Sequence, residues 1–415
     1  MKILIGAFGT RGDVQPMLAL AQTLISRGHG VSLAVPPNSV PLARAFGVDA
    51  FAVGLDYEEI SRRAVNGSFR ELASMFPLVR GEVHAQLQAL EEPGAAADVI
   101  VGSSVCTVGT LLSDLLRKPY VFFAFCPQLF PSGDHPNPSV PWHSWPRWLN
   151  RLSWVTHGWL WQTVLLSTIN GAREARGLPP TRDVWSSLIG RAPVLACDPA
   201  LASAPSDYPI PITHLGALFA EESDDLSPEV RAFIEAGEPP VYIGFGSMSD
   251  RDPAGTTQRL LESIRRARVR ALVSRGWAGL SSAASSSDVL FIGPEPHGKL
   301  FPRCAAVVHH GGAGTTHAAT RAGVPQVVLP QLLDQHYWAR RVQLAGIGPR
   351  SVPRYSRNPA PLARAIRHCL DDAAMRQRAR DLSARIRTSG TSEAADLVEE
   401  LGTHRSATGK LHSAA

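Results

Sequence analysis

Short apolar runs that end at or near a glycine, each followed by a helix-like segment, recur along both halves of the chain. The first run, Lys2–Gly6, leads through a loop to Val14–Arg27, where apolar residues recur at helical spacing. Further runs lie at 31–35, 99–101 and 120–125. Continuous apolar runs of this length are typical of strands buried on both faces, as in a parallel sheet between helices. The alternation predicts βα units in the first half of the chain.

The second half repeats this plan. Its predicted strands are 240–246, 271–274, 289–292, 305–309 and 326–330, with a helix over 254–267 and another that ends near 323. The stretch 221–237 between the halves is acidic and contains proline and glycine, which is typical of an interdomain linker. The sequence therefore predicts two doubly wound α/β domains that face each other across a cleft, with ligands beyond the carboxyl ends of the strands.

The composition is typical of a globular protein and limits the classes of ligand that it is expected to bind. Of the 415 residues, 44% are hydrophobic and 19% are charged, and the formal net charge is only +5. The basic residues form no runs and no stripe with interleaved aromatic residues, which argues against nucleic-acid binding. A mildly positive cleft suits a small anionic ligand such as a nucleotide diphosphate.

The five cysteines are odd in number and never form a CxxC pair, so we expect neither a disulfide framework nor a zinc site. They are typical of small buried hydrophobic residues in a reducing compartment. The N-terminus lacks the apolar region of a secretory signal, and no apolar run reaches the roughly 18 residues of a membrane-spanning helix. We therefore expect a cytoplasmic protein.

The segment His309–Thr316, with the sequence HHGGAGTT, follows a predicted strand and precedes a predicted helix. Its glycines permit positive φ and let a ligand approach the backbone closely. The helix start offers free N–H groups and the positive end of its dipole, which together favour phosphate, and an imidazole there can donate to a phosphate oxygen. The alternative is a glycine-rich turn that only connects strand and helix, but the paired histidines and threonines favour a ligand site.

The region Pro294–Gly348, which contains this loop, resembles the donor-binding region of GT-B glycosyltransferases. Within that family it is most similar to the bacterial natural-product enzymes, which act on macrolide and glycopeptide antibiotics, and to the sterol glucosyltransferases. Three further segments resemble signatures of the same family: Gly9–Pro16 (GTRGDVQP), Gly244–Met248 (GFGSM) and the pair Gly276-Trp277.

The resemblance implies a GT-B fold made of two Rossmann-like domains. An acceptor-binding domain would span 1–220, the linker 221–237, and a donor-binding domain 238–385. The last segment, 386–415, would carry a helix that crosses back to the first domain and then a polar tail.

The resemblance also implies roles for individual residues toward a nucleotide-sugar donor. The diphosphate would be held by His309, Gly312, Gly314, Thr315 and Thr316 and by the hydroxyl of Ser247. The sugar hydroxyls would be bound by the adjacent Asp334 and Gln335, because a carboxylate and an amide can accept from and donate to neighbouring hydroxyls. The nucleobase would lie beside Trp277, Pro296 and His297.

Asp13 is the candidate general base. It follows the first predicted strand, in a glycine-containing loop at the start of a helix. Attack on a sugar requires removal of a proton from a poorly acidic alcohol, which a positioned carboxylate can accept. Many relatives have a histidine at this position, and the aspartate groups this chain with the antibiotic and sterol members. The alternative is that Asp13 only caps the helix, and Thr10 or His135 are candidates to assist it.

The segment Pro127–Trp161 interrupts the βα pattern with six tryptophans and several prolines. Such aromatic density can line a pocket for an apolar ligand, so we assign Trp142 and Trp145 to the acceptor side, together with Thr10 and His135. One alternative is a helical excursion that packs a small core of its own. Another is a weak membrane-surface contact, since tryptophan favours that interface.

The segment Asp250-Arg-Asp252 has the DxD form that holds a metal in another glycosyltransferase fold. Its position just before a predicted helix predicts capping instead, so we expect no metal site. No GxxxxGK[ST] segment is present, which excludes a P-loop NTPase.

We therefore expect an inverting, metal-independent transferase that uses no cofactor. It would move a hexose, with glucose as the expected sugar, from a UDP-sugar to a hydroxyl of a lipophilic acceptor such as a polyketide macrocycle or a sterol. The helix dipole and an imidazole would ease departure of the diphosphate. The alternatives are a dTDP-deoxysugar transferase of antibiotic biosynthesis, an epimerase or phosphorylase of the same fold, and a non-catalytic nucleotide-sugar-binding partner.

Overall fold

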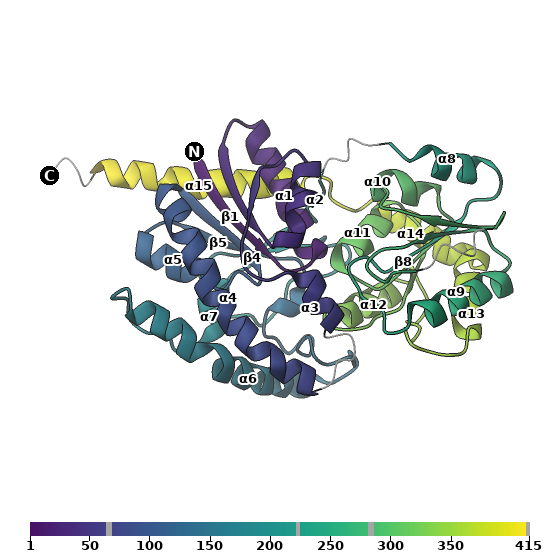
Figure 1. Cartoon of the computed structure of the whole chain (residues 1–415), viewed down its shortest axis with the longest axis horizontal. Helices are drawn as coiled ribbons and strands as arrows, with labels where there is room; N and C mark the ends of the chain where they lie inside the picture. Colours follow the sequence, from purple (N-terminus) through teal and green to yellow (C-terminus); the bar gives the residue numbers. More distant parts are fainter. Residues whose placement is uncertain (64–68, 221–224, 281–285, 412–415) are drawn as a thin grey trace.

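The computed structural model describes residues 1–63, 69–220, 225–280 and 286–411, which form two α/β domains side by side (Figure 1). Over these residues, the sheet of the first domain has seven strands in the order β3-β2-β1-β4-β5-β6-β7. The sheet of the second domain has five strands in the order β10-β9-β8-β11-β12. The strands of both sheets pair in parallel, which confirms the predicted pair of doubly wound domains.

The first sheet consists of β1 (Lys2–Phe8), β2 (Gly30–Val35), β3 (Ala50–Ala52), β4 (Val99–Ser104), β5 (Tyr120–Ala124), β6 (Pro193–Ala196) and β7 (Thr213–Leu215). The second consists of β8 (Val241–Gly244), β9 (Ala271–Ser274), β10 (Val289–Ile292), β11 (Ala306–His309) and β12 (Gln326–Val328). Each predicted strand is present. The pattern did not indicate β3, β6 and β7.

The helices of the first domain are α1 (Arg11–Ser26), α2 (Val40–Ala45), α3 (Tyr57–Arg63), α4 (Phe69–Ala96), α5 (Gly109–Leu116), α6 (Arg147–Glu174) and α7 (Val184–Ile189). Those that follow are α8 (Pro228–Glu235), α9 (Pro253–Ala267), α10 (His297–Leu300), α11 (Ala313–Arg321), α12 (Gln335–Leu344), α13 (Ala360–Asp371), α14 (Ala373–Ser383) and α15 (Gly390–Leu411).

Alternate residues of β1 face the two sides of the first sheet, and both sides are buried. Leu4 and Phe8 pack into the core that includes α4 and α5, whereas Ile3 and Ile5 pack into the core that includes α1 and α15. Because helices cover both faces, the strand is apolar at consecutive positions rather than at every second one.

Parallel pairing brings the carboxyl ends of the strands to one edge of each sheet. In the first domain Phe8 pairs with Ser104, so the loops after β1 and β4 are neighbours. In the second domain His309 pairs with Gly244 and with Val328, so the loops after β8, β11 and β12 are neighbours. The candidate ligand loops of each domain therefore lie together.

The segment 221–237 does not form a free linker throughout. Leu226 and Val230 are buried in a core of the second domain, and Arg270 donates to the carbonyl of Phe233 and lies over its ring. Helix α8 therefore belongs to the second domain. Residues 221–224 lie outside the described part of the chain.

Helix α15 runs back along the first domain, as Figure 1 shows in yellow. Ala394, Ala395 and Val398 are buried in the core beside α1. Arg27 donates to Asp396 at 2.6 Å, which adds an ion pair at the rim of this contact. The helix continues to Leu411, well into the segment for which a polar tail was predicted.

Asp198 joins the two domains. Its backbone N–H donates to Nε2 of His317 in α11 at 3.0 Å, and the other ring nitrogen of His317 pairs with the carbonyl of Ala313. The buried carboxylate of Asp198 accepts the N–H of Arg387, just before α15, at 2.7 Å and that of Ala200 at 2.8 Å. One residue of the first domain therefore holds both α11 and the returning chain.

We expect Asp198→Ala to lower the free energy of unfolding by about 2–4 kcal/mol. The substitution leaves the amides of Ala200 and Arg387 without their acceptor, and each loss costs about 1–3 kcal/mol. Urea denaturation measures the change, with Asp381→Ala on the exposed side of α14 as the matched control, which should stay within about 0.5 kcal/mol of the wild type. Equal effects of the two substitutions would contradict the interdomain role of Asp198.

Candidate active site

The carboxylate of Asp13 is held by the loop between β1 and α1. Its Oδ2 accepts the backbone N–H of Thr10 at 2.8 Å and the Thr10 hydroxyl at 3.2 Å, and the two residues form a capping box. Gly9 has a φ of 127°, and a Cβ at this position would lie 2.3 Å from Oδ2. Only glycine therefore lets the loop close over the carboxylate. The predicted alternative made Asp13 the cap itself, whereas the N-cap is Thr10 and Asp13 is the third helical residue, whose carboxylate accepts the Thr10 N–H. This capping box orients the same carboxylate that a base would use.

Ser104, at the carboxyl end of β4, lies near Asp13, and its hydroxyl lowers the pKa of that carboxyl group. Its φ of 46° is in the left-handed region, which is uncommon for serine. Burial raises the pKa of Asp13 above its ordinary value, and the hydrogen bonds from Ser104 and Thr10 offset part of that rise. A raised pKa makes the carboxylate a stronger base, while the hydrogen bonds fix its direction.

His309, the last residue of β11, is fully buried and uses both ring nitrogens within the protein. The Nε2 of Gln326 donates to Thr316 and Thr320, so its Oε1 faces the Nε2 of His309 as an acceptor at 2.9 Å. The Nδ1 of His309 accepts the N–H of Gly311 at 3.1 Å. No ring nitrogen is left for a phosphate, so the predicted diphosphate contact of His309 does not fit this geometry.

His310, the second histidine of this pair, has a ring nitrogen that remains available for a ligand. The ring lies between two glycine loops, because a Cβ on Gly312 would be 2.5 Å from its Nε2 and one on Gly246 would be 3.1 Å from its Cε1. Within the described residues, Nδ1 of His310 has no hydrogen-bond partner. Burial, followed by interactions with His309 and Arg354, lowers the pKa of His310 to about 3. The ring is therefore neutral near pH 7 and carries one N–H donor.

The start of α11 leaves amides open. A Cβ on Gly314 would meet no atom within 4 Å, and the N–H groups of Gly314 and Thr315 have no acceptor in the described part of the chain. Thr316 differs, because both its N–H and its hydroxyl donate to the carbonyl of Gly312, at 3.0 and 2.8 Å. The predicted contact of Thr316 with the diphosphate therefore does not fit, whereas Gly312, Gly314 and Thr315 lie at the open end.

Gln335 is also used inside the protein. Its Oε1 accepts the amides of Gln331 and Leu332 at 2.8 and 3.2 Å, and its Nε2 lies 3.0 Å from the sulfur of Met248. The side chain is 3% exposed. It shapes the loop before α12 through its oxygen, while one N–H of its amide remains available, so its contact with a sugar hydroxyl stays a prediction.

Asp334 faces the cleft from the second domain. It is partly exposed, and its Oδ2 accepts from Nε1 of Trp338 at 3.1 Å. Burial and, second, the negative charge of Asp13 raise its pKa to about 7. Because Asp13 belongs to the first domain, this effect indicates that the two carboxylates lie on the two sides of the same cleft.

The predicted nucleobase residues lie at the same edge of the second sheet. Gly276 has a φ of 47°, and the N–H of Trp277 donates to the carbonyl of Gly246 at 3.1 Å, next to the buried Ser247. Trp277 and Pro296 are partly exposed.

His297 stacks on Phe301 at 4.3 Å between ring centroids. Burial and then the positive charge of Arg11 lower the pKa of His297 to about 3. Arg11 is in the first turn of α1, so the loop that carries Asp13 also directs a cation toward the second domain.

The predicted acceptor residues form no single group. His135 is buried against Trp154 and against Tyr337 of α12, and burial lowers its pKa to about 4. Trp142 stacks on Trp145 at 5.9 Å and lines a hollow of about 340 Å³ between its loop and α12. Thr10 donates its hydroxyl to Asp13.

The DxD segment serves local structure. Asp252 caps α9 by accepting the N–H of Gly255 at 2.9 Å, which confirms the capping prediction. Asp250 forms a buried ion pair with Arg354 at 2.8 Å. Among residues 1–63, 69–220, 225–280 and 286–411, no group of three or more His, Cys, Asp or Glu side chains is arranged to hold a metal.

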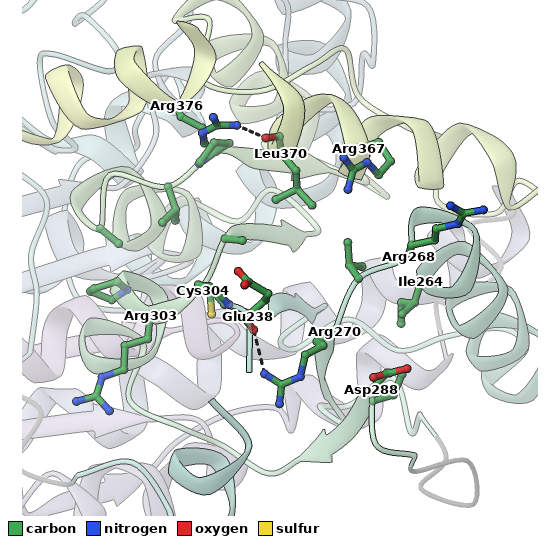
Figure 2. A pocket seen from close by; sticks show the side chains of 18 of the residues that line it. Glu238, Ile264, Arg268, Arg270, Asp288, Arg303, Cys304, Arg367, Leu370 and Arg376 are labelled. Atoms are coloured by element: carbon green, nitrogen blue, oxygen red, sulfur yellow. Dashed lines mark hydrogen bonds between the residues drawn. The ribbon is translucent and has the colours of Figure 1, made fainter. Parts of the chain in front are cut away.

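A wide cavity of about 1190 Å³ lies elsewhere in the second domain (Figure 2). It is lined by residues that precede the strands, such as Glu238, Arg270 and Asp288, so it occupies the amino edge of the sheet. Two of its arginines donate to backbone carbonyls, Arg270 to Glu238 and Arg376 to Leu370. Because ligands of open α/β sheets bind at the carboxyl edge, this cavity is not the candidate site.

Comparison with known proteins identifies the family. Residues 3–123 match the glycosyltransferase family 28 N-terminal domain, and residues 281–401 match the C-terminal domain described as erythromycin biosynthesis protein CIII-like. Over 413 residues the chain is 33% identical to a vancomycin aglycone glucosyltransferase of Amycolatopsis orientalis, which covers 96% of this chain and 97% of that protein. The chain belongs to the GT-B glycosyltransferases.

Other relatives agree. A sterol 3-beta-glucosyltransferase of Arabidopsis thaliana is 32% identical over an alignment of 392 residues, and the alignment covers 89% of this glycosyltransferase and 63% of that protein. The solved glycosyltransferase of kitacinnamycin has a TM-score of 0.72 at 18% identity, covering 96% of this chain and 98% of that one. The glycosyltransferase VinC in complex with dTDP has a TM-score of 0.68 at 18% identity, covering 97% and 100%.

Sequence reasoning missed three residues of this glycosyltransferase that lie at the site: Arg11, Ser104 and His310. His310 was within the recognised motif, and its pairing with His309 was the available signal. Ser104 could not be identified from the sequence, because serine is common after a strand and nothing in the sequence indicates its left-handed backbone conformation.

We expect His310→Ala to weaken binding of a nucleoside diphosphate by about 1.5–3 kcal/mol, the range for a hydrogen bond to a charged group. His309→Ala should instead lower the free energy of unfolding by about 1–3 kcal/mol, because it leaves Gln326 and Gly311 without their partner. Calorimetry with UDP and dTDP and urea denaturation separate the two effects. If His309→Ala weakened nucleotide binding and His310→Ala lowered only the stability, the phosphate contact would belong to His309.

We expect Ser104→Gly to move the acid limb of the kcat/KM profile to higher pH. The Ser104 hydroxyl lowers the pKa of Asp13, so its removal raises that pKa and the base is protonated up to a higher pH. Glycine also relieves the left-handed backbone, so stability should not fall. Arg117→Gly, at a φ of 53° on the C-cap of α5, is the control for strain relief alone and should leave the profile unchanged. An unchanged profile for Ser104→Gly would show that Ser104 does not position the base.

Proposed function

We propose that the chain catalyses an inverting, metal-independent transfer of glucose from UDP-glucose to a hydroxyl of a lipophilic acceptor. The observation that carries this proposal is the convergence at the cleft: Asp13 with its raised pKa faces Asp334 and the open start of α11. A proton acceptor from one domain thus faces a sugar-binding carboxylate and a phosphate site from the other.

In this mechanism Asp13 removes the proton from the acceptor hydroxyl as the hydroxyl oxygen attacks the anomeric carbon. A bond forms between that oxygen and the anomeric carbon while the bond to the diphosphate oxygen breaks, and the diphosphate leaves with the electron pair. The products are the glycoside and UDP, and the proton stays on Asp13 until solvent takes it.

The growing negative charge on the diphosphate would be stabilised by the second domain. The amides of Gly314 and Thr315 and the dipole of α11 point their positive ends at the open space, and the neutral imidazole of His310 adds one N–H donor. Ser247 adds a hydroxyl from the neighbouring loop. These groups would stabilise the negative charge of the leaving diphosphate, a role that a metal cation has in other transferases.

Two features support glucose as the sugar and a lipophilic acceptor. The most similar relatives reported above are named glucosyltransferases, of a glycopeptide aglycone and of sterols. The aromatic pair Trp142–Trp145 lies beside the gap between its loop and α12 and offers apolar surface to a bulky ring system.

The second candidate is transfer of a deoxysugar from a dTDP donor. It is favoured by the fold match to VinC in complex with dTDP, although that protein is only 18% identical. Incubation with UDP-glucose and, in parallel, with a dTDP-deoxysugar, over a panel of glycopeptide aglycones, macrolactones and sterols, tests both proposals by mass. A gain of one hexose only with UDP-glucose supports the first, and a gain only with the dTDP donor replaces it with the second.

We expect Asp13→Asn to reduce kcat by about 10²–10⁴-fold, the usual effect of removing a general base. Asparagine keeps the size and capping ability of aspartate, so the melting temperature should change little, and UDP binding should persist because the other domain holds the diphosphate. The measurement is kcat at saturating donor and acceptor. A folded variant that turns over near the wild-type rate would remove Asp13 from the mechanism.

A further inference from the structure

Helix α6 carries an apolar stripe that no other part of the described chain covers. Trp148, Leu152, Val155 and Trp159 recur at helical spacing and are 64%, 51%, 66% and 71% exposed. Figure 1 places α6 at the outer edge of the first domain, and it packs there against α4 and α7. Isolated exposed apolar residues need no explanation, but four on one face of one helix mark a contact surface.

The stripe is separate from the rest of the tryptophan-rich segment. Trp154 is 6% exposed and packs edge-on against Trp185 of α7, so part of the segment does form a small core, as one of the predicted alternatives had it. Further along the same helix the outward positions are Thr163 and Ser167. The apolar character of the outer face is therefore confined to the first half of α6.

The charge around the stripe indicates what covers it. From His135 to Arg173 the chain contains no Asp or Glu, although the whole sequence has 36 acidic residues. Arg147 and Arg151, with side chains 51% and 60% exposed, lie on the same turns as Trp148 and Leu152. Both pair with Asp207 of the first domain, and Arg147 also pairs with Asp134, so two carboxylates balance these two guanidinium charges. The stripe is therefore bordered by paired charge, and its attraction to a surface comes from its apolar side chains.

We propose that the α6 stripe docks the protein on a lipid surface. Tryptophan favours the boundary between lipid headgroups and acyl chains, and a helix with an apolar face, flanking arginines and no acidic side chain on that face lies in this boundary. Among the described residues, no helix is long and apolar enough to cross a membrane, so the contact is one of a helix lying on the surface. This inference does not depend on which sugar or acceptor the enzyme uses.

The stripe begins near the hollow between the Trp142 loop and α12. Trp142, 62% exposed, lies just before α6 and lines the hollow beside His336 and Arg340 of α12. A docked protein would thus hold that hollow close to the lipid. For an acceptor dissolved in lipid this arrangement shortens the route to the cleft, a consequence that rests on the proposed function.

The test is flotation of the full chain with vesicles of phosphatidylcholine alone or with phosphatidylglycerol. We expect the wild type to float with both kinds of vesicle, because the exposed tryptophans supply most of the attraction. Added salt should change flotation little, since the flanking arginines are already paired with carboxylates. The double variant Trp148→Ser, Trp159→Ser should lower the partition coefficient at least about tenfold, because each tryptophan buries about 150–250 Å². Val155→Asp, which places an acid in the stripe, should act in the same direction.

The matched control is Ile25→Ser with Leu344→Ser, which removes two exposed apolar residues, 41% and 56% exposed, from other helices and should leave flotation unchanged. The proposal would be overturned if the wild type floated with neither kind of vesicle. It would also be overturned if the stripe variants floated to the same extent as the wild type. Light scattering adds one more outcome: a wild-type dimer that the double variant abolishes would assign the stripe to a second copy of the chain instead of lipid.

Discussion

The buried contacts of Asp198 fix how the two domains face each other, and the site depends on that relation. Asp198 holds His317, on the same short helix whose open end carries Gly314 and Thr315, and it also holds the chain that leads into α15. Helix α15 then packs on α1, whose first turn carries Asp13. The base and the phosphate loop are thus connected through a short series of buried contacts, which resists separation of the domains in a way that exposed ion pairs do not.

Within each domain, the site is built from side chains that serve the fold and side chains left free by it. His309, Thr316 and Gln335 satisfy buried polar groups and give the loops their shape. Their neighbours His310, Thr315 and Asp334 keep unpaired or partly exposed groups at the cleft. A rigid inner set that orients an outer set is what preorganised stabilisation of a leaving group requires.

Much of this could be predicted from the sequence, and the remainder was missed for physical reasons. Continuous apolar runs located β1, β2, β4, β5 and all strands of the second sheet, and the glycines located the loops after β1 and β11. The sequence could not tell which of two adjacent histidines faces the cleft, because successive residues of a strand point to opposite sides and only the position of Gln326 settles it. Nor could it separate the buried Trp154 from the exposed Trp159, since both lie in one apolar-rich helix whose faces are set by packing on α4 and α7.

The central claim is that one carboxylate, Asp13, activates the acceptor for a single direct displacement, while Asp334 only binds the sugar. The most direct measurement is the anomeric configuration of the product made from UDP-α-glucose, read from its anomeric proton by NMR. A single displacement predicts a β-glucoside. An α-glucoside would require two displacements or a front-side attack and would contradict this account.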